Sequence, residues 1–235
     1  MFEKLSLIGV NLNTIQEQKF VSFIELFKSC SKKINLISSN DTEVLFEKHI
    51  FDSLAFNLFY EKYLSHILPL KLLDIGTGGG FPSIPLAIFY EDFNITPLDS
   101  VNKKINFINY AKEKLKLYNV TPVCSRVEDL PLFYKNGYDI SVSRAVADLR
   151  IILEYAVPFV KTGGYFAAYK SVKAEEEIKN AHNALKILNS EIVDIIDYKL
   201  PLSEENTRKL IIIKKNKETP SKYPRKNGLI KKTPL

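Results

Sequence analysis

The chain has 235 residues, 46% of them hydrophobic and 26% charged, and this composition excludes wholesale disorder, a collagen-like repeat and a coiled-coil rod. The length predicts one domain with at most a small appendage, and no apolar run approaches the ~18 residues that a membrane span needs. Because the N-terminus lacks a signal-peptide pattern and Cys30 and Cys124 form no local pair, we expect a cytoplasmic chain with two free thiols and no metal framework.

The net charge of +6 is concentrated at the C-terminal end of the chain. Residues 214–235 hold eight of the 33 lysine and arginine residues and a single acid, Glu218, so this segment carries +7 and the preceding residues sum to −1. Such an asymmetry predicts a polyanionic partner, nucleic acid first and an anionic membrane second. The alternative is a solvated tail that only aids solubility.

Residues 1–68 are predicted to be helical. Thr14 and Glu17 have the spacing of a capping box, in which the threonine caps the helix and the glutamate reaches back. Apolar residues follow at helical spacing (Phe20, Phe23, Ile24 and Phe27). Residues 44–63 carry a second, less regular apolar pattern. Because a helix with one apolar face must cover something, we expect this region to pack on the domain that follows.

Short apolar runs alternate with helical patterns from residue 69 to residue 214, and residues 215–235 form a basic C-terminal tail. The expected strands are 70–75, 94–98, 120–124, 138–143, 165–169, 192–200 and 208–213. The expected helices are 84–90, 102–117, 149–159 and 174–188. This alternation predicts a doubly wound, mostly parallel α/β sheet. The short connection between the last two strands allows that pair to be antiparallel.

A glycine-rich turn joins the first strand to its helix. Gly76, Gly78 and Gly80 allow a tight turn and a close approach of the backbone to a ligand. Ligands of open α/β sheets bind at the carboxyl ends of the strands near the switch in strand order, where this turn is expected. The dinucleotide fingerprint requires a glycine where Phe81 stands, so the pattern favours a nucleoside-type ligand without a pyrophosphate. A dinucleotide site and a purely structural turn remain the alternatives.

Two further acids follow strands of the expected sheet. Asp99 ends the second strand, where a carboxylate can accept hydrogen bonds from both hydroxyls of a ribose. Val127 and Glu128 follow the third strand, where the edge of a base can bond to backbone N–H groups or to the carboxylate. Each acid taken alone can also be an ordinary loop residue.

Several catalytic patterns are missing from the sequence. The histidines His49, His66 and His182 lack metal-ligand spacing, and neither a Walker A lysine nor a nucleophile-elbow serine is present. These absences argue against a zinc enzyme, a P-loop NTPase and a serine hydrolase, and no catalytic residue or metal ligand is assigned.

The residues of the glycine turn resemble the cofactor loop of a known family. The segments that carry this resemblance are Asp74–Leu86, Asn35-Leu36, Lys48–Leu54, Ser143–Ala147, Ala167–Lys170 and Thr219–Lys226. They are similar to segments of the ribosomal RNA small-subunit methyltransferase G family, also called glucose-inhibited division protein B. The similarity runs from about residue 5 to the end. One mild departure is Ser171, where the family usually has glycine.

The resemblance implies a class I, Rossmann-like methyltransferase fold with an N-terminal helical extension and S-adenosylmethionine as methyl donor. It implies methylation of N7 of one guanine in small-subunit (16S) ribosomal RNA, with ribosomal RNA or a ribosomal subunit precursor as partner. We also expect no membrane partner and a monomer. The cofactor residues that it implies are Gly76, Gly78, Phe81, Asp99, Val127, Glu128 and Arg144. The expected RNA-contacting residues are Arg144, Lys170, His49, Lys222, Arg225 and Lys226.

The expected reaction needs no general base, because guanine N7 carries a free lone pair. Proximity and alignment can then supply most of the catalysis. Two other functions stay open: a nucleotide-dependent oxidoreductase, and an RNA-binding protein that has lost its activity. We expect the tail to be an extended arm along RNA phosphates. The rival interpretation is that Tyr223 and Pro224 dock it on the body of the protein.

Overall fold

The computed structural model describes residues 1–31, 36, 43–65, 69–171, 174–202 and 207–235. Asn35 and His66 lie outside the described residues. The described chain folds around one seven-stranded sheet with the strand order β3-β2-β1-β4-β5-β7-β6. The strands are β1 (Lys71–Ile75), β2 (Asn94–Asp99), β3 (Val123–Cys124), β4 (Tyr138–Arg144), β5 (Val160–Lys170), β6 (Ser190–Lys199) and β7 (Thr207–Lys215).

The sheet is parallel except at β7, which runs antiparallel to both of its neighbours. The expected doubly wound, mostly parallel α/β fold is therefore confirmed. The order of strands reverses between β1 and β4, which lie side by side at the centre of the sheet. The carboxyl ends of β1, β2 and β4 meet there, so this edge of the sheet is the expected position for a ligand.

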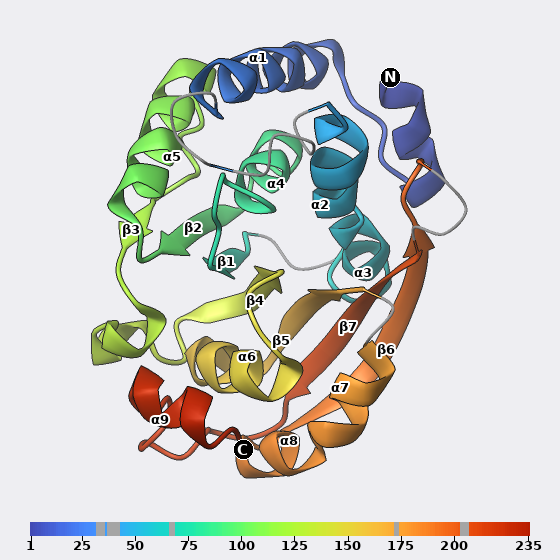
Figure 1. The fold of residues 1–235 in the computed structure, drawn as a ribbon. Coiled ribbons are helices and arrows are strands. Elements are labelled where there is room, and N and C mark those ends of the chain that lie inside the picture. Colours follow the sequence, from blue (N-terminus) through green and yellow to red (C-terminus); the bar gives the residue numbers. More distant parts are fainter. Residues whose placement is uncertain (32–35, 37–42, 66–68, 172–173, 203–206) are drawn as a thin grey trace.

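Helices cover both faces of the sheet (Figure 1). One layer contains α1 (Thr14–Ser31), α2 (Asp52–Leu54), α3 (Phe56–Tyr63), α4 (Ser83–Phe89) and α5 (Asn102–Leu115). The other contains α6 (Leu149–Ala156), α7 (Ala174–Asn180), α8 (His182–Ile187) and α9 (Asn227–Lys232). Short turns of other helix types are η1 (Phe2–Ile8), the π-helix η3 (Phe46–Phe51), η4 (Val127–Asp129), η5 (Leu132–Tyr134) and η6 (Val157–Phe159).

The N-terminal helices share a core with the sheet. Phe23 and Phe27 of α1 are fully buried and pack against Phe81 in the glycine loop, with ring centroids 5.6 and 5.3 Å apart. A Cβ atom added to Gly79 would lie only 2.8 Å from Cε2 of Phe27, so the glycine lets α1 approach the loop closely. Burial of such aromatic rings is worth about 2–3 kcal/mol each, so α1 and the glycine loop are held together by a common core.

The capping box of α1 differs from the prediction by one residue. The Asn13 side chain accepts from the Gln16 backbone N–H at 2.9 Å, and the Gln16 side chain accepts from the Asn13 N–H at 3.0 Å. Thr14 is already the first helical residue, so the prediction of a Thr14–Glu17 box is wrong. Asparagine caps as well as threonine does, and glutamine can reach back as glutamate does.

Three element boundaries also differ from the prediction. The third strand, expected over residues 120–124, is only Val123–Cys124. Val120 lies outside it and makes an isolated bridge to Ile95. β5 begins at Val160 and continues through Gly163 and Gly164, whereas the strand was expected to begin at residue 165. The expected single helix 174–188 is divided into α7 and α8 at Ala181.

The basic tail is not an extended arm in this structure. Tyr223 and Ile230 are 5% and 0% exposed and belong to the core that α6 and α8 cover. Lys215 at the end of β7 is buried, and its ammonium donates to Asn136 Oδ1 and to the carbonyl oxygens of Val157 and Val160. Burial lowers the pKa of Lys215 to about 8. The tail docks on the body, as the rival interpretation expected, because apolar residues stand between its charged ones.

Candidate functional site

The glycine loop crosses the end of β2. The backbone N–H groups of Gly76 and Thr77 donate to the Leu98 carbonyl oxygen at 2.8 and 3.0 Å. Gly76 has a φ of +75°, and a Cβ atom there would lie 2.5 Å from Cγ2 of Val146. The absence of a side chain at Gly76 therefore lets the loop after β4 close over the loop after β1.

Asp74 anchors the glycine loop from below. Its carboxylate is fully buried and accepts from the Ser83 hydroxyl at 2.6 Å, which ties β1 to the start of α4. Burial raises the pKa of Asp74 to about 6, although the hydrogen bonds from Ser83 act in the opposite direction. The protein thus keeps a carboxyl group with a strongly perturbed pKa beneath the loop.

Asp99 lies at the end of β2, beside the glycine loop. Its Oδ2 accepts from the Gly78 N–H at 3.0 Å and its Oδ1 from the Val101 N–H at 2.9 Å. The Lys104 ammonium is 3.6 Å from Oδ2. These partners hold the carboxylate at the strand end, in the position from which a carboxylate binds ribose hydroxyls in this fold class.

A cavity of about 290 Å³ opens at the ends of β1, β2 and β3, and we call it the glycine-loop cavity. It is lined by Ile75, Gly76, Leu98, Asp99, Ser100, Ser125, Arg126, Val127, Glu128, Val146, Ala147, Tyr155 and Lys231. Its lining is contributed by three strand ends, by α6 and by the C-terminal tail. The expected positions for a nucleoside ligand are thus brought together around one space.

Glu128 brings a buried acceptor to this cavity. Its side chain is 7% exposed, and among the described residues no group donates a hydrogen bond to its Oε1. The Arg126 guanidinium is 3.9 Å away, too far for a hydrogen bond. Tyr155 lies close enough that the Glu128 charge adds to burial in raising the pKa of the tyrosine to about 12. A ligand with an N–H group would satisfy the carboxylate.

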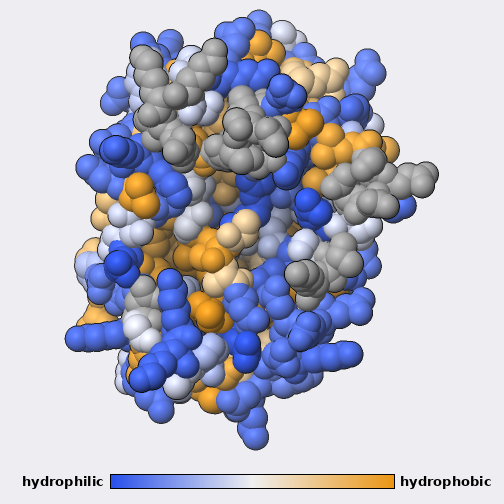
Figure 2. Space-filling view, viewed as in Figure 1, coloured by the Kyte–Doolittle hydropathy of each residue, from blue (hydrophilic) through white to orange (hydrophobic). Residues whose placement is uncertain are grey.

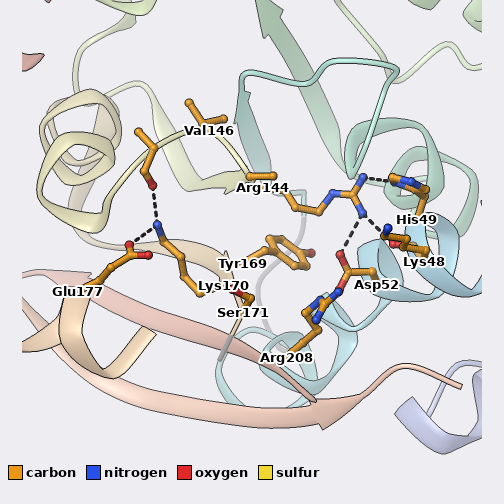
Figure 3. Close-up of a pocket in the computed structure, with 12 residues that line it drawn as sticks. Lys48, His49, Asp52, Arg144, Val146, Tyr169, Lys170, Ser171, Glu177 and Arg208 are labelled. Atoms are coloured by element: carbon orange, nitrogen blue, oxygen red, sulfur yellow. Dashed lines mark hydrogen bonds and ion pairs between the residues drawn. The ribbon is translucent and has the colours of Figure 1, made fainter. Parts of the chain in front are cut away.

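A second and larger cavity, of about 540 Å³, adjoins the first, and we call it the Arg144 cavity. It is lined by Lys48, His49, Asp52, Arg144, Ala145, Val146, Ala147, Tyr169, Lys170, Ser171, Glu177 and Arg208 (Figure 3). Val146 and Ala147 line both cavities. The loop after β4 is therefore the wall between two spaces at the same edge of the sheet.

Arg144 is held by residues of the N-terminal region. Its Nη1 lies 2.9 Å from Asp52 Oδ2 and 3.2 Å from the Lys48 carbonyl oxygen, and its Nη2 lies 2.6 Å from His49 Nδ1 (Figure 3). A guanidinium group only donates, so His49 Nδ1 accepts. The guanidinium also lies 5.3 Å from the centroid of the Phe81 ring. These contacts direct Arg144 away from the glycine-loop cavity.

Lys170 lies on the opposite side of the Arg144 cavity. Its ammonium donates to Glu177 Oε2 and to the Ala147 carbonyl oxygen, each at 2.6 Å. The pair is partly exposed, at 11% for Lys170 and 24% for Glu177. Lys170 therefore braces the loop after β4 while its charge faces the cavity.

The structure distributes the predicted site residues over three places. Gly76, Asp99, Val127 and Glu128 line the glycine-loop cavity, and Gly78 is bonded to Asp99 beside it. His49, Arg144 and Lys170 line the Arg144 cavity. Phe81 is 3% exposed and lies in the core between α1 and His49.

The predicted tail residues lie away from both cavity linings, on the docked segment. Arg225 forms an ion pair with the fully buried Glu154. Its guanidinium therefore stabilises the docked tail, in contrast to the predicted contact with RNA. Lys222 and Lys226 are exposed.

Most of the residues that line the two cavities were not predicted as site residues, and Asp52, Val146, Tyr155 and Lys231 are four of them. Asp52 lies three positions after His49 on the same helical segment, a spacing that places both on one helix face. Val146 lies in the Ser143–Ala147 segment that carries the family resemblance, but no site role was expected for it. Tyr155 comes from an apolar stretch, and Lys231 was one of many basic residues in the tail.

Within the described part of the chain, no three or more histidine, cysteine or acidic side chains are grouped so that they could hold a metal ion. Nor does any helix of that part have the length and apolarity required to cross a membrane. Figure 2 shows apolar atoms gathered near the centre of the face drawn in Figure 1, with hydrophilic side chains around its lower rim.

Comparison with known proteins gives matches over the whole chain. A family model described as rRNA small subunit methyltransferase G matches residues 16–211. A protein of Acetivibrio thermocellus named ribosomal RNA small subunit methyltransferase G is 40% identical over 100% of this chain and 95% of its own length. A protein of Staphylococcus saprophyticus with the same name is 39% identical over 99% of this chain and 96% of its own length.

Solved structures share the fold at low identity. A 16S rRNA adenine-N1 methyltransferase from Catenulisporales acidiphilia is 15% identical, with a TM-score of 0.52 over 68% of this chain and 88% of that chain. The cyclase SpnF is 16% identical, with a TM-score of 0.56 over 71% of this chain and 82% of that chain. The expected class I fold is confirmed, and a cyclase on the same fold illustrates that the fold alone does not identify a reaction.

Proposed function

Since the chain belongs to the rRNA small subunit methyltransferase G family, we propose that it transfers a methyl group from S-adenosylmethionine to N7 of a guanine in small-subunit (16S) ribosomal RNA. The observation that carries the proposal is the pair of adjoining cavities at the carboxyl edge of the sheet, which share Val146 and Ala147. A methyl transfer needs the donor and the acceptor to lie next to each other. Two cavities that share lining residues allow this arrangement.

The residues of the glycine-loop cavity fit the donor. Asp99 supplies two carboxylate oxygens at the end of β2 for ribose hydroxyls, and Glu128 supplies a buried acceptor that suits the amino group of adenine. Gly76 lets the loop after β4 close over the turn, so that Val146 lines the cavity. When bound, S-adenosylmethionine supplies an electrophilic methyl group on a sulfonium.

The Arg144 cavity fits a nucleotide of an RNA. Lys48, Arg144, Lys170 and Arg208 bring positive charge to its lining, against the acids Asp52 and Glu177. Positive side chains position the phosphates of an RNA without reading its sequence. Ala147 continues the wall toward the donor, so a base in this cavity lies next to the glycine-loop cavity.

Guanine N7 needs no deprotonation, and the side chains around Arg144 agree with a mechanism without a base. Asp52 is engaged by Arg144 and by the Tyr198 hydroxyl, which donates to Oδ1 at 2.6 Å. His49 Nδ1 accepts from Arg144. The protein's contribution is to hold the two substrates in line and to exclude water, which can provide most of the rate enhancement. We assign no residue a catalytic proton transfer.

One chain lines both cavities, so we propose that the protein acts as a monomer. We also propose that it acts on RNA in the cytoplasm. The exposed tail lysines Lys222 and Lys226 add positive charge for the RNA.

The test is to incubate the protein with labelled S-adenosylmethionine and small-subunit RNA, or with small subunits from cells that lack it, and to map 7-methylguanosine. We expect one methylated guanine. Binding of NADH without binding of S-adenosylhomocysteine would favour an oxidoreductase. Binding of RNA and S-adenosylhomocysteine without methylation of either substrate would favour an RNA-binding protein that has lost its activity.

A further inference from the structure

The C-terminal tail is anchored by a buried acid of α6. Glu154 is 0% exposed, and both of its oxygens accept from Arg225: Oε1 from the backbone N–H and from Nε, each at 2.8 Å, and Oε2 from Nη2 at 2.6 Å. A bidentate pair of this kind fixes orientation as well as distance. Because an unpaired buried carboxylate is costly, this contact strongly favours the docked tail.

Contacts on both sides of Arg225 extend the anchor. The Lys135 ammonium donates to the carbonyl oxygens of Ser221 and Tyr223 at 2.9 and 2.6 Å, before the arginine. After it, Arg225 Nη2 donates to the Thr233 carbonyl oxygen at 3.1 Å, and Ile230 is fully buried. The short helix α9 is thus held at both of its ends.

This anchor determines where α9 lies. The helix packs beside α6 (Figure 1), and its Lys231 reaches the lining of the glycine-loop cavity, together with Tyr155 of α6 and Glu128. Tyr155, Glu128 and Lys231 thus all line the same cavity. Among the residues after 155 that the structure describes, Lys231 is the one that lines this cavity.

We infer that Lys231 is a donor-binding residue, and that the Arg225–Glu154 anchor is what positions it. The inference rests on the proposed function, because it takes S-adenosylmethionine as the ligand of the glycine-loop cavity. The heterocycle of the donor carries ring nitrogens that only accept hydrogen bonds, and a lysine ammonium only donates. Glu128 suits the amino group of the same ring, so the two side chains offer complementary partners to one base.

The first test measures binding of S-adenosylhomocysteine by calorimetry. Lys231→Ala should weaken binding by about three- to tenfold, less than for a buried charged group because water competes for the exposed ammonium of Lys231. Lys232→Ala is the matched control, since Lys232 is also exposed, lies on the same helix and does not line the cavity. An affinity of the Lys231→Ala protein equal to that of the wild type would overturn the inference.

The second test removes the Arg225–Glu154 ion pair without leaving either charged group buried and unpaired. In the double variant Glu154→Gln/Arg225→Met, the tail should dock less firmly, and binding should weaken about as much as in Lys231→Ala. Adding Lys231→Ala to the double variant should then have little further effect. Full additivity of the two changes would show that the anchor does not position Lys231. A urea unfolding curve of each variant checks that the body remains folded.

Amide hydrogen exchange gives an independent readout. If the tail helps to bind the ligand, the ligand must stabilise docking of the tail to the same degree. Exchange of the amides of residues 229–233 should therefore slow when S-adenosylhomocysteine is added, and unchanged exchange would contradict the inference. A wild-type protein that does not bind S-adenosylhomocysteine would refute the proposed function itself. Normal wild-type binding with an unaffected Lys231→Ala variant refutes only the role of Lys231.

Discussion

Arg144 and Asp52 form an ion pair of 2.9 Å that joins the end of β4 to the N-terminal helical region, with both side chains largely buried. The same guanidinium contacts His49, so one arginine connects the central switch point of the sheet to the helices that precede it. The lining of the Arg144 cavity consequently depends on contacts between segments more than ninety positions apart in the sequence.

Asp52→Ala should lower the free energy of unfolding by about 3 kcal/mol, because it leaves a buried guanidinium without its counter-ion. Arg144→Met added to Asp52→Ala should recover part of the loss. Urea denaturation measures both. Asp197→Ala, which removes a pair with Lys209 at the surface, is the control and should cost less than about 1 kcal/mol. Equal losses for the two single variants would contradict the structural role of the Arg144–Asp52 pair.

Glu128→Ala should weaken binding of S-adenosylhomocysteine by roughly ten- to a hundredfold, since a charged hydrogen bond to the ligand is lost. Calorimetry gives the affinity. The neighbouring Asp129→Ala is the control, because Asp129 is exposed and lies outside the cavity lining. If both variants bind with the wild-type affinity, the carboxylate of Glu128 does not face the ligand.

Gly76→Ala should destabilise the protein through two effects. The left-handed backbone costs an alanine about 1–2 kcal/mol, and the new Cβ meets the Val146 side chain at 2.5 Å. Gly163→Ala separates these effects, because Gly163 has a φ of +84° and open space around it. Thermal unfolding should show a greater loss for Gly76→Ala than for Gly163→Ala. The double variant Gly76→Ala/Val146→Ala should remove the excess, and its persistence would mean that Val146 is not the cause.

Asp74 should make the protein less stable as the pH rises from about 4 to 6. The pKa of Asp74 is raised to about 6 in the folded state against an ordinary 3.8, so between these values the folded state binds more protons than the unfolded state. The cost of ionisation is complete above pH 6 and amounts to about 3 kcal/mol. Asp74→Asn abolishes it, so the stability of the wild type relative to this variant should rise as the pH falls from 7 to 4.5. Parallel urea stability curves for the two proteins across that range would disprove the shift.

Lys222→Gln/Lys226→Gln should reduce the salt dependence of RNA binding without unfolding the tail. Each lost contact with a phosphate of single-stranded RNA lowers the slope of log affinity against log salt by about 0.7, which gives roughly 1.4 for two. Filter binding at several salt concentrations measures the slope. The melting temperature should stay constant, because both side chains are exposed. An unchanged slope would show that these lysines do not contact the RNA.

The sequence predicts the sheet and the glycine loop well because both depend on local patterns. Apolar runs of strand length and the glycine spacing after Asp74 locate β1 and its loop to within a residue. The capping box differs by one position because Asn13 and Thr14 are both good caps, and local preference barely separates them.

The partners of the tail residues could not be predicted, because they depend on contacts over long sequence separations. Glu154 is an acid within an apolar helix, which indicates burial but does not select a partner among eight basic tail residues 60 or more positions away. Only the folded chain identifies Arg225. The same holds for Lys231, whose position depends on that pairing.

The shared core of the N-terminal helices and the sheet has a consequence for how this protein can be divided. Phe23 and Phe27 pack on Phe81, and the ring of Phe27 occupies the space that a side chain at Gly79 would need. The described helices of the N-terminal region are therefore not an independent domain that could be removed or exchanged between relatives. A graft of these helices must carry the loop that they cover.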